Sequence, residues 1–323
     1  MPPMMNVLIV RTSSMGDLIH TWPALTDLMR HYPNASVSWL AEENFCDLAG
    51  LHPAVRDVIP LSWRRWRKCL LCPATWREIG AMRRKLQATR WDLVIDSQGL
   101  LKSAIPARLA RAPLAGLDWK SCREPLASLL YNKRYRVSWS QSAVARNREL
   151  FSMVFGYTPV GEAVFGIRAA ERPAWLPDGS YVMLLHATSK KSKEWQEHQW
   201  LELASNLFET EGLRAVFPWG NAREHQRAER LARLCPQAVC APRMNLREAA
   251  GALAHARAVV GVDTGLSHLA NALDIPLVAI YTDTDPASTG VVETRFATNL
   301  GGIGCNPTVD EVLAALRPRM GIA

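Results

Sequence analysis

The stretch Asn6-Val7-Leu8-Ile9-Val10-Arg11-Thr12-Ser13-Ser14-Met15-Gly16-Asp17 decides the fold of this chain. Residues 7–10 form an apolar run that is too short for a helix and dense enough for a buried parallel strand. Small polar residues follow, and a helical segment begins near Leu18. This order predicts the first strand, turn and helix of a doubly wound α/β domain, in which turns at the carboxyl ends of strands bind ligands.

The polar turn of this stretch has features that suit an anion. Its backbone N–H groups and the start of the next helix favour negative charge, and Gly16 lets the backbone approach a ligand closely. Asp17 differs, because its carboxylate would repel a phosphate group placed on the same turn. Two interpretations of Asp17 stay open: it accepts a proton from a hydroxyl group, or it only caps the helix.

Length and charge indicate two domains with different partners. The chain has 323 residues, of which 48% are hydrophobic, and this is enough for two packed cores. Its net charge of +8 is uneven: residues 1–160 hold 22 basic and 12 acidic residues, and residues 161–323 hold 16 and 18. We therefore expect the first half to face nucleic acid, a phosphorylated sugar or an acidic membrane surface.

The seven cysteines form no pattern that indicates a metal site. Cys69 and Cys72 make one C-x-x-C motif, but no second pair or nearby histidine completes a zinc site. We expect free thiols in a reducing cytosol. We also expect no signal peptide and no membrane span, because the sequence lacks a basic leader with an apolar core and any run of about 18 apolar residues.

Strand and helix patterns alternate along the rest of the chain. Apolar runs predict strands at residues 37–40, 58–61, 92–96, 182–185, 214–217, 238–240, 258–262 and 277–281. This alternation indicates mostly parallel sheets with helices on both faces. Prolines and glycines interrupt the pattern at residues 159–180, which we interpret as a linker between domains at residues 1–158 and 181–323. Two such domains would leave a cleft between them.

Two turns in the second half have the composition of a nucleotide site. Thr188 and Ser189 offer hydroxyl groups close to Lys193, which could neutralise a diphosphate or simply belong to a solvated basic surface. The turn Asp263-Thr264-Gly265 precedes a helix, so its N–H groups can point at an anion. His268 follows in the first turn of that helix, where a structural role is the alternative to a catalytic one.

Other acidic residues and motifs carry weaker signals. Glu224 could accept hydrogen bonds from a ribose or could cap its own helix. Asp283 and Asp285 have the spacing of a D-x-D metal motif, but acidic residues before a proline are commonly a turn, and we expect no metal. Neither half contains G-x-G-x-x-G after its first strand or a P-loop, which argues against a dinucleotide dehydrogenase and a P-loop enzyme.

The stretch Trp63-Arg64-Arg65-Trp66-Arg67-Lys68 is the most basic part of the first half. Guanidinium groups bind phosphate and carboxylate with two parallel hydrogen bonds. The two tryptophans could stack on a base or sugar, or anchor the chain at a lipid interface. A solvated basic loop is the alternative.

Six motifs together resemble the lipopolysaccharide heptosyltransferase I branch of glycosyltransferase family 9, in the same order from about residue 5 to residue 290. These motifs are Thr12-Ser13-Ser14-Met15-Gly16-Asp17, Asp96-Ser97-Gln98-Gly99-Leu100, Arg123-Glu124-Pro125-Leu126-Ala127-Ser128, His186-Ala187-Thr188, Pro218-Trp219-Gly220 and Val262-Asp263-Thr264-Gly265-Leu266-Ser267-His268. The resemblance implies a GT-B fold, with two Rossmann-like domains that face a central cleft. The tail after about Asp285 matches poorly.

The resemblance also implies an inverting transfer of heptose from ADP-heptose to the Kdo of Kdo-lipid A in the lipopolysaccharide inner core. The N-terminal domain would bind the acceptor and the C-terminal domain the donor. Asp17 would be the catalytic base, and the donor would be bound by Thr188, Ser189, Lys193, Glu224, Met244, Asp263, Thr264, Gly265 and His268. We expect the acceptor to be bound by Ser14, Arg64, Arg65, Arg67 and Arg123.

These implications set the expected cofactors and partners. We expect no cofactor, no metal and no nucleic acid, and a monomer that works in the cytoplasm, peripherally on the inner-membrane surface. Two alternatives remain: a related heptosyltransferase with another acceptor, and a non-catalytic protein that binds an anionic ligand.

Overall fold

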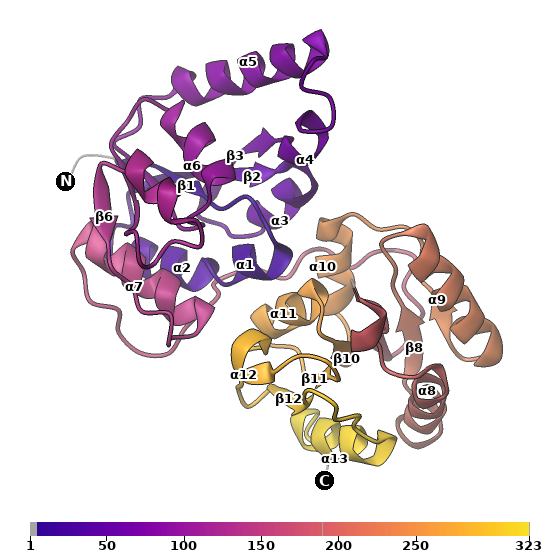
Figure 1. Ribbon diagram of the computed structural model, residues 1–323. Helices are drawn as coiled ribbons and strands as arrows, with labels where there is room; N and C mark the ends of the chain where they lie inside the picture. The colour runs from indigo at the N-terminus through magenta and orange to yellow at the C-terminus, as the bar shows by residue number, and fades with distance from the viewer. Residues whose placement is uncertain (1–4, 189, 323) are drawn as a thin grey trace. The chain divides into compact units, whose positions relative to one another are not determined.

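The computed structural model describes residues 5–188 and 190–322. The chain divides into two compact units between Arg168 and Ala169 (Figure 1). This boundary lies inside residues 159–180, where we expected the linker, and these residues contain no helix or strand. Phe165 is nevertheless buried, so the start of this stretch packs on the first unit.

The first unit contains a six-stranded parallel sheet in the order β3-β2-β1-β4-β5-β6. Its strands are β1 (Asn6–Val10), β2 (Ser36–Glu42), β3 (Val55–Leu61), β4 (Leu93–Asp96), β5 (Leu114–Leu117) and β6 (Lys133–Tyr135). Its helices are α1 (Met15–Ile19), α2 (Trp22–His31), η1 (Glu43–Phe45), α3 (Cys46–Ala49), α4 (Trp63–Trp66), α5 (Pro73–Ala88), α6 (Leu101–Arg108), η2 (Pro125–Leu130) and α7 (Ala143–Phe155). Helices α2 and α7 pack together on one face of the sheet, and α5 and α6 lie on the other (Figure 1).

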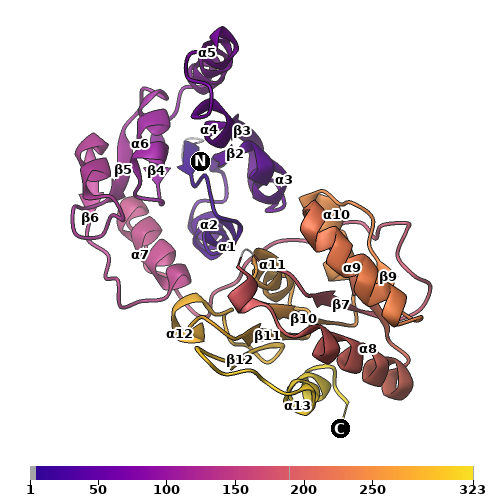
Figure 2. The ribbon, with the colours of Figure 1, turned by 45° about the vertical axis from the view of Figure 1, so that its right-hand side comes forward.

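The second unit repeats this plan with a six-stranded parallel sheet in the order β12-β11-β10-β7-β8-β9. Its strands are β7 (Tyr181–Leu185), β8 (Arg214–Phe217), β9 (Val239–Cys240), β10 (Ala258–Val262), β11 (Leu277–Tyr281) and β12 (Ala297–Gly301). Its helices are η3 (Lys191–Lys193), α8 (Glu197–Glu211), α9 (Ala222–Leu234), α10 (Leu246–Ala254), α11 (Gly265–Ala272), α12 (Pro286–Thr289) and α13 (Val309–Arg319). Helices α8 and α13 pack together, as do α10 and α11 (Figure 2).

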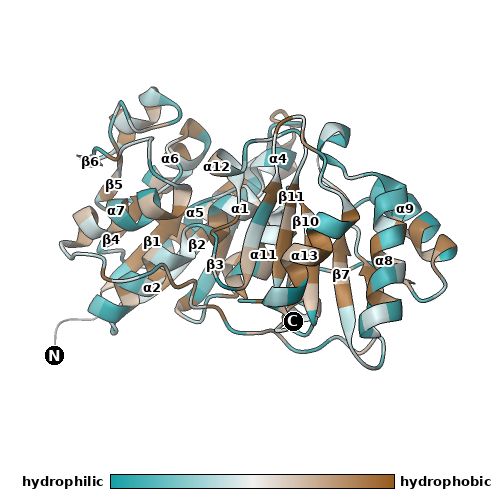
Figure 3. Cartoon of the chain, turned by 90° about the horizontal axis from the view of Figure 1, so that it is seen from below, coloured by the Kyte–Doolittle hydropathy of each residue, from teal (hydrophilic) through white to brown (hydrophobic). Residues whose placement is uncertain are grey.

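The residues after about Asp285 contribute to the core of the second unit. Trp195 and Trp200 are fully buried and meet edge to face at 5.0 Å, and the indole N–H of Trp195 donates to the carbonyl oxygen of Pro307 at 2.8 Å. Val312 and Leu316 of α13 join the same core. Apolar residues concentrate on the strands beneath these helices (Figure 3). The strand β12 and the helix α13, which sequence patterns did not predict, therefore complete the sheet and cover it.

Each sheet has one point at which the chain reverses its direction of winding. In the first unit this switch point lies between β1 and β4, and in the second unit between β7 and β10. Turns at the carboxyl ends of such strand pairs form the ligand-binding crevice of doubly wound sheets. The turns after β1 and β10 contain Asp17 and Asp263, so both sheets place predicted site residues at their switch points. No helix in the described residues is long and apolar enough to cross a membrane.

Candidate active site

Asp17 lies in the first turn of α1, directly after the β1 turn. Its Oδ2 atom accepts hydrogen bonds from the backbone N–H and the hydroxyl group of Ser14, both at 2.8 Å. Ser14 is therefore the N-cap residue, and Asp17, the third residue of the helix, supplies the reciprocal half of a capping box. Since this contact uses only Oδ2, the carboxylate keeps Oδ1 for other partners.

Two arginines face that second oxygen. Nη2 of Arg11 lies 2.8 Å from Oδ1 of Asp17, and Nη2 of Arg123 lies 3.7 Å from it. Burial acts to raise the pKa of Asp17, but Arg11, the Ser14 N–H and Arg123 together hold that pKa well below its usual value. Asp17 is therefore a carboxylate at neutral pH. Arg11 follows β1 directly in the sequence, a position that could have marked it as a site residue.

The turn that carries Asp17 is fastened to the turn after β4 by side-chain hydrogen bonds. Oε1 of Gln98 accepts from both the backbone N–H and the hydroxyl group of Thr12, each at 2.8 Å. The ammonium group of Lys102 donates to the hydroxyl oxygen of Ser13 at 2.8 Å. These hydrogen bonds therefore connect the two turns that flank the switch point into one continuous surface.

A pocket in the first unit lies at this continuous surface. Asp17, Arg11 and Arg123 line it together with Arg146 and Trp139. The guanidinium carbon of Arg146 lies 3.4 Å from the centre of the Trp139 ring. Sequence patterns did not single out Arg146 or Trp139, because nothing local distinguishes one arginine of α7 from its neighbours.

The basic stretch after β3 is only partly available to a ligand. Arg64 and Arg67 are exposed, whereas Arg65 pairs with the carboxylates of Glu43 at 3.0 Å and Glu78 at 2.8 Å. The indole N–H of Trp66 also donates to Glu78, at 2.7 Å, and Trp66 is buried. Lipid anchoring, one of the roles that the sequence left open for the two tryptophans, does not apply to Trp66, because its ring packs inside the unit.

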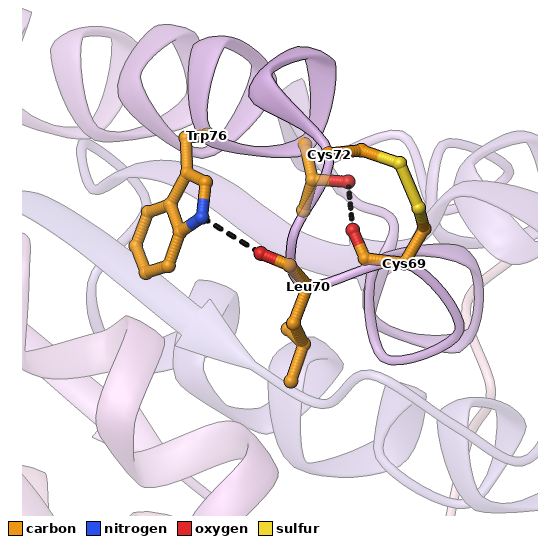
Figure 4. The surroundings of a disulfide bond; sticks show 5 residues. Cys69, Leu70, Cys72 and Trp76 are labelled. Carbon is orange, nitrogen blue, oxygen red and sulfur yellow. Dashed lines mark hydrogen bonds between the residues drawn. A yellow bond between two sulfur atoms is a disulfide. The ribbon is translucent and has the colours of Figure 1, made fainter.

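The expectation of free thiols is wrong for the C-x-x-C motif. Cys69 and Cys72 form a disulfide in the turn between α4 and α5 (Figure 4). The backbone N–H of Cys72 donates to the carbonyl oxygen of Cys69 at 3.2 Å, and the turn brings the two Cα atoms to 5.5 Å. That separation lies in the range that a disulfide spans. We expected free thiols because the cytosol is reducing, and we did not consider that the turn brings the two cysteines together.

In the second unit, the turns after β7 and β10 are joined. The hydroxyl group of Thr188 donates to the carbonyl oxygen of Asp263 at 2.7 Å. Nζ of Lys193 lies 2.7 Å from Oδ2 of Asp263, and the hydroxyl group of Thr284 donates to the same oxygen at 2.8 Å. Thr188, Lys193 and Asp263, three residues that we predicted to bind the sugar donor, are therefore in direct contact with one another. Ser189 lies outside the described residues.

The helix α11 begins directly after this turn. Thr264 is its N-cap residue, Gly265 is its first residue, and His268 is buried within its first turns. A side chain at Gly261 would come within 2.5 Å of the Ser267 hydroxyl, so β10 and the start of α11 pack closely. The helix amino terminus is thus held at the switch point, where its N–H groups suit an anion.

The remaining predicted donor residues lie at other helix starts. Both carboxylate oxygens of Glu224 accept hydrogen bonds from the start of α9, from the Gly220 N–H at 2.7 Å and from the Asn221 amide. Met244 is half-buried just before α10. Asp285 caps α12 by accepting from the Ala287 N–H at 2.9 Å, which agrees with a turn. Among the residues that the structure describes, no three His, Cys, Asp or Glu cluster as a metal site needs.

The fold defines a class of protein. Two doubly wound α/β units in one chain, each with a six-stranded parallel sheet, are the GT-B architecture, which many glycosyltransferases have. The comparisons with known proteins agree. The sequence profile of "Glycosyltransferase family 9 (heptosyltransferase)" matches residues 79–315. The chain belongs to this family of glycosyltransferases, which confirms the resemblance in the sequence.

Individual relatives match nearly the whole chain. Lipopolysaccharide heptosyltransferase 1 of Pseudomonas aeruginosa is 45% identical over 88% of this chain and 81% of its own length. The Escherichia coli K12 protein of that name is 45% identical over 88% of this chain and 90% of its own. The solved structure "E. coli heptosyltransferase WaaC with ADP" matches with a TM-score of 0.90 and 41% identity, covering 98% of this chain and all of that one. The same enzyme solved with ADP-2-deoxy-2-fluoro heptose gives 0.85 at 40% identity, over 96% and 98%.

Proposed function

We propose that this chain transfers L-glycero-D-manno-heptose from ADP-heptose to the Kdo of Kdo-lipid A, with inversion, in lipopolysaccharide inner-core synthesis. The observation that carries the proposal is the similarity along almost the full chain to heptosyltransferase 1 proteins, including one solved with ADP and with a fluorinated ADP-heptose. The first unit would bind the acceptor and the second unit the donor. The charge supports this division, because the first half carries the excess of basic residues and the acceptor is acidic.

In this mechanism Asp17 is the general base. The acceptor hydroxyl attacks the anomeric carbon of heptose from the face opposite ADP, and Asp17 takes the hydroxyl proton. Its low pKa keeps Asp17 ionised at neutral pH, as a base must be, although it also makes the carboxylate a weak proton acceptor. The contacts with Ser14 fix the direction in which the carboxylate points.

The second unit would stabilise the leaving ADP. Lys193 is positioned by Asp263 and can donate to the diphosphate as negative charge builds on it. The N–H groups at the start of α11 add a second source of positive potential. We expect these groups to take the place of a metal ion, so activity should survive a chelator.

An acceptor that carries lipid A also places this enzyme at a membrane surface, and the turn between α4 and α5 has the composition for it. We name Leu70 and Leu71 of this turn, together with Trp76 near the start of α5, the apolar loop; their exposed fractions are 50%, 98% and 61%. The indole N–H of Trp76 donates to the carbonyl oxygen of Leu70 at 2.8 Å, so the ring lies against the turn that the disulfide closes (Figure 4). Exposed basic residues flank this loop at Arg67, Lys68 and Arg77. Apolar tips beside cationic side chains suit an anionic bilayer.

A product assay tests the proposal. ADP-heptose and de-acylated Kdo-lipid A should give a product heavier by one heptose, with and without a chelator. Asp17→Asn should lower turnover by about 10² to 10⁴, the usual range for a positioned general base, while ADP affinity stays the same. A loss of only a few-fold would remove Asp17 from the role of base. Absence of any product with this pair of substrates would overturn the proposed function.

A further inference from the structure

The disulfide between Cys69 and Cys72 closes the turn between α4 and α5, and hydrogen bonds hold the same turn without it (Figure 4). The N–H of Cys72 donates to the carbonyl oxygen of Cys69 at 3.2 Å, and the hydroxyl group of Thr75 donates to the same oxygen at 2.8 Å. The two cysteines are only three positions apart, so the bond removes little freedom from the unfolded chain. We therefore expect the turn to stay folded when the bond opens.

The two sulfur atoms have different surroundings. Cys69 is exposed, whereas Cys72 is half-buried and is the N-cap residue of α5, a helix of 16 residues. An N-cap side chain normally accepts a hydrogen bond from the free N–H groups of the first turn, and the bonded sulfur of Cys72 makes no such contact. A thiolate at Cys72 could accept these hydrogen bonds, and the helix dipole would stabilise its charge.

The charged residues near this turn also favour a thiolate. Arg67, Lys68 and Arg77 flank the two cysteines in the sequence, and all three are exposed. The acidic residue of the same region, Glu78, forms an ion pair with Arg65 at 2.8 Å, which neutralises its carboxylate. Cationic neighbours lower the free energy of a thiolate relative to its thiol.

The free cysteines do not share these features. Burial raises the pKa of Cys46 to about 11 and that of Cys122 to about 12, so both remain thiols at neutral pH. Cys305 is exposed, but it lies in the turn after β12 and caps no helix. Because the thiolate is the reactive form of cysteine, the pair at the start of α5 combines access with reactivity.

We propose that Cys69 and Cys72 form a reversible site of thiol–disulfide exchange with small thiols of the glutathione class, and that the state of this bond controls how tightly the apolar loop docks on an anionic bilayer. The second half of this inference rests on the proposed function. We expect a reducing cytosol for this chain, and the disulfides of that compartment are usually transient and redox-active.

The exchange consists of two displacements. The thiolate of one glutathione attacks the exposed sulfur of Cys69, forms a mixed disulfide there and expels Cys72 as a thiolate, the better stabilised leaving group. A second glutathione then attacks the mixed disulfide. Two protein thiols and one oxidised glutathione result, so two electrons and two protons pass to the protein. In the reverse direction, Cys72 attacks the mixed disulfide on Cys69 and releases glutathione.

The bond affects docking because Leu70 and Leu71 lie between the two cysteines. The closed disulfide restricts the backbone of these two exposed residues, so less conformational freedom is lost when they enter a bilayer. After reduction, the hydrogen bond from the Trp76 indole to the Leu70 carbonyl oxygen remains, but no covalent bond closes the turn. The oxidised chain should therefore bind an anionic bilayer more tightly than the reduced chain.

The first experiment examines the exchange and requires neither substrate nor membrane. The full-length protein is equilibrated with mixtures of reduced and oxidised glutathione and alkylated, and its peptides are measured by mass spectrometry. The bond should open and close reversibly while the circular dichroism spectrum stays the same. In the reduced protein, iodoacetamide should modify Cys72 at least about tenfold faster than Cys305, which serves as the reference thiol.

Variants assign the roles of the two sulfurs. With oxidised glutathione, Cys72→Ser should accumulate a mixed disulfide on Cys69, because no thiol remains to release the glutathione. Cys305→Ser is the matched control and should leave the exchange unchanged. The exchange site is wrong if Cys72 reacts no faster than Cys305, or if the bond opens only in denaturant, whatever the activity of the protein.

The second experiment addresses docking. Oxidised and reduced protein are sedimented with vesicles that contain phosphatidylglycerol, and the oxidised form should bind at least about threefold more tightly. The double variant Cys69→Ser/Cys72→Ser should bind like the reduced form in both buffers. Equal binding by the two forms would overturn control of docking. Failure of both forms to bind would instead count against the membrane surface in the proposed function, and absence of product with the soluble acceptor would count against the transfer reaction.

Discussion

Nζ of Lys193 lies 2.7 Å from Oδ2 of Asp263, and this ion pair joins the turns on either side of the switch point in the second sheet. Both side chains are largely shielded from solvent, at 17% and 12% exposure. An ammonium group carries three donors, so Asp263 can position Lys193 and still leave donors for a diphosphate. Asp263 therefore has a physical role in placing the ammonium group of Lys193.

We predict that Lys193→Met weakens ADP binding and lowers turnover together, each by about 10- to 100-fold, because a hydrogen bond to a charged group is worth roughly 1.5–3 kcal/mol. Calorimetry with ADP and initial rates measure the two effects. Lys191→Met, two residues earlier and exposed, is the control. If affinity and rate both stay at the wild-type values, Lys193 belongs to the solvated surface.

We predict that Arg64→Gln and Arg67→Gln raise the acceptor KM and leave the donor KM unchanged. Both side chains are exposed, so each contact contributes up to about 1 kcal/mol, and added salt should have the same effect as the substitutions. Arg65→Gln should behave differently, because Arg65 is held by Glu43 and Glu78. Steady-state kinetics with soluble acceptor separate the three variants, and an unchanged acceptor KM in Arg64→Gln would exclude it from acceptor binding.

We predict that Leu71→Ser and Trp76→Ser weaken binding to vesicles that contain phosphatidylglycerol, each by about tenfold, because burial of a large apolar side chain is worth roughly 1.5–3 kcal/mol. Turnover of the soluble, de-acylated acceptor should not change. Sedimentation with vesicles measures the binding. Leu234→Ser is a suitable control, since Leu234 is 64% exposed at the end of α9. Equal vesicle binding by all three variants would show that the apolar loop does not dock on lipid.

We predict that the first unit loses stability as the pH falls from about 6.5 toward 4, through His52. Burial lowers the pKa of His52 to about 4 from an ordinary value of 6.5. Nδ1 of its ring accepts from the Ala54 N–H at 3.2 Å, which requires the neutral form. The unfolded chain therefore takes up the proton first, and stability decreases through this pH window.

The size of that effect is about 2 kcal/mol between pH 7 and pH 5, at 1.36 kcal/mol per pKa unit. His52→Gln should be less stable at pH 7 but should lose less stability on acidification. Calorimetric unfolding at both pH values provides the comparison. His198→Gln, at an exposed position of α8, should keep the wild-type pH dependence. An identical acid response in His52→Gln would assign the effect to another group.

The sequence by itself determined the α/β class, most strands and the turns that carry the chemistry. Runs such as Val7–Val10 and Ala258–Val262 are buried on both faces of a parallel sheet, so they consist almost entirely of apolar residues and are visible locally. Asp263 stands directly after such a run and Asp17 follows one through a short polar turn, and parallel strands bring their carboxyl ends to one edge. The strand β12 was missed because only Ala297 and Leu300 of its five residues, ATNLG, have apolar side chains.

Only the tertiary structure decided which side chains act together. Lys193 and Asp263 are 70 residues apart, and Arg11, Arg123 and Arg146 come from three different elements around one pocket. Trp66 and Leu71 belong to the same short stretch. Trp66 is buried and donates a hydrogen bond to Glu78, whereas Leu71 is almost fully exposed. Burial and ion pairing depend on neighbours that are distant along the chain, whereas strand and turn patterns depend on neighbours that are adjacent in it.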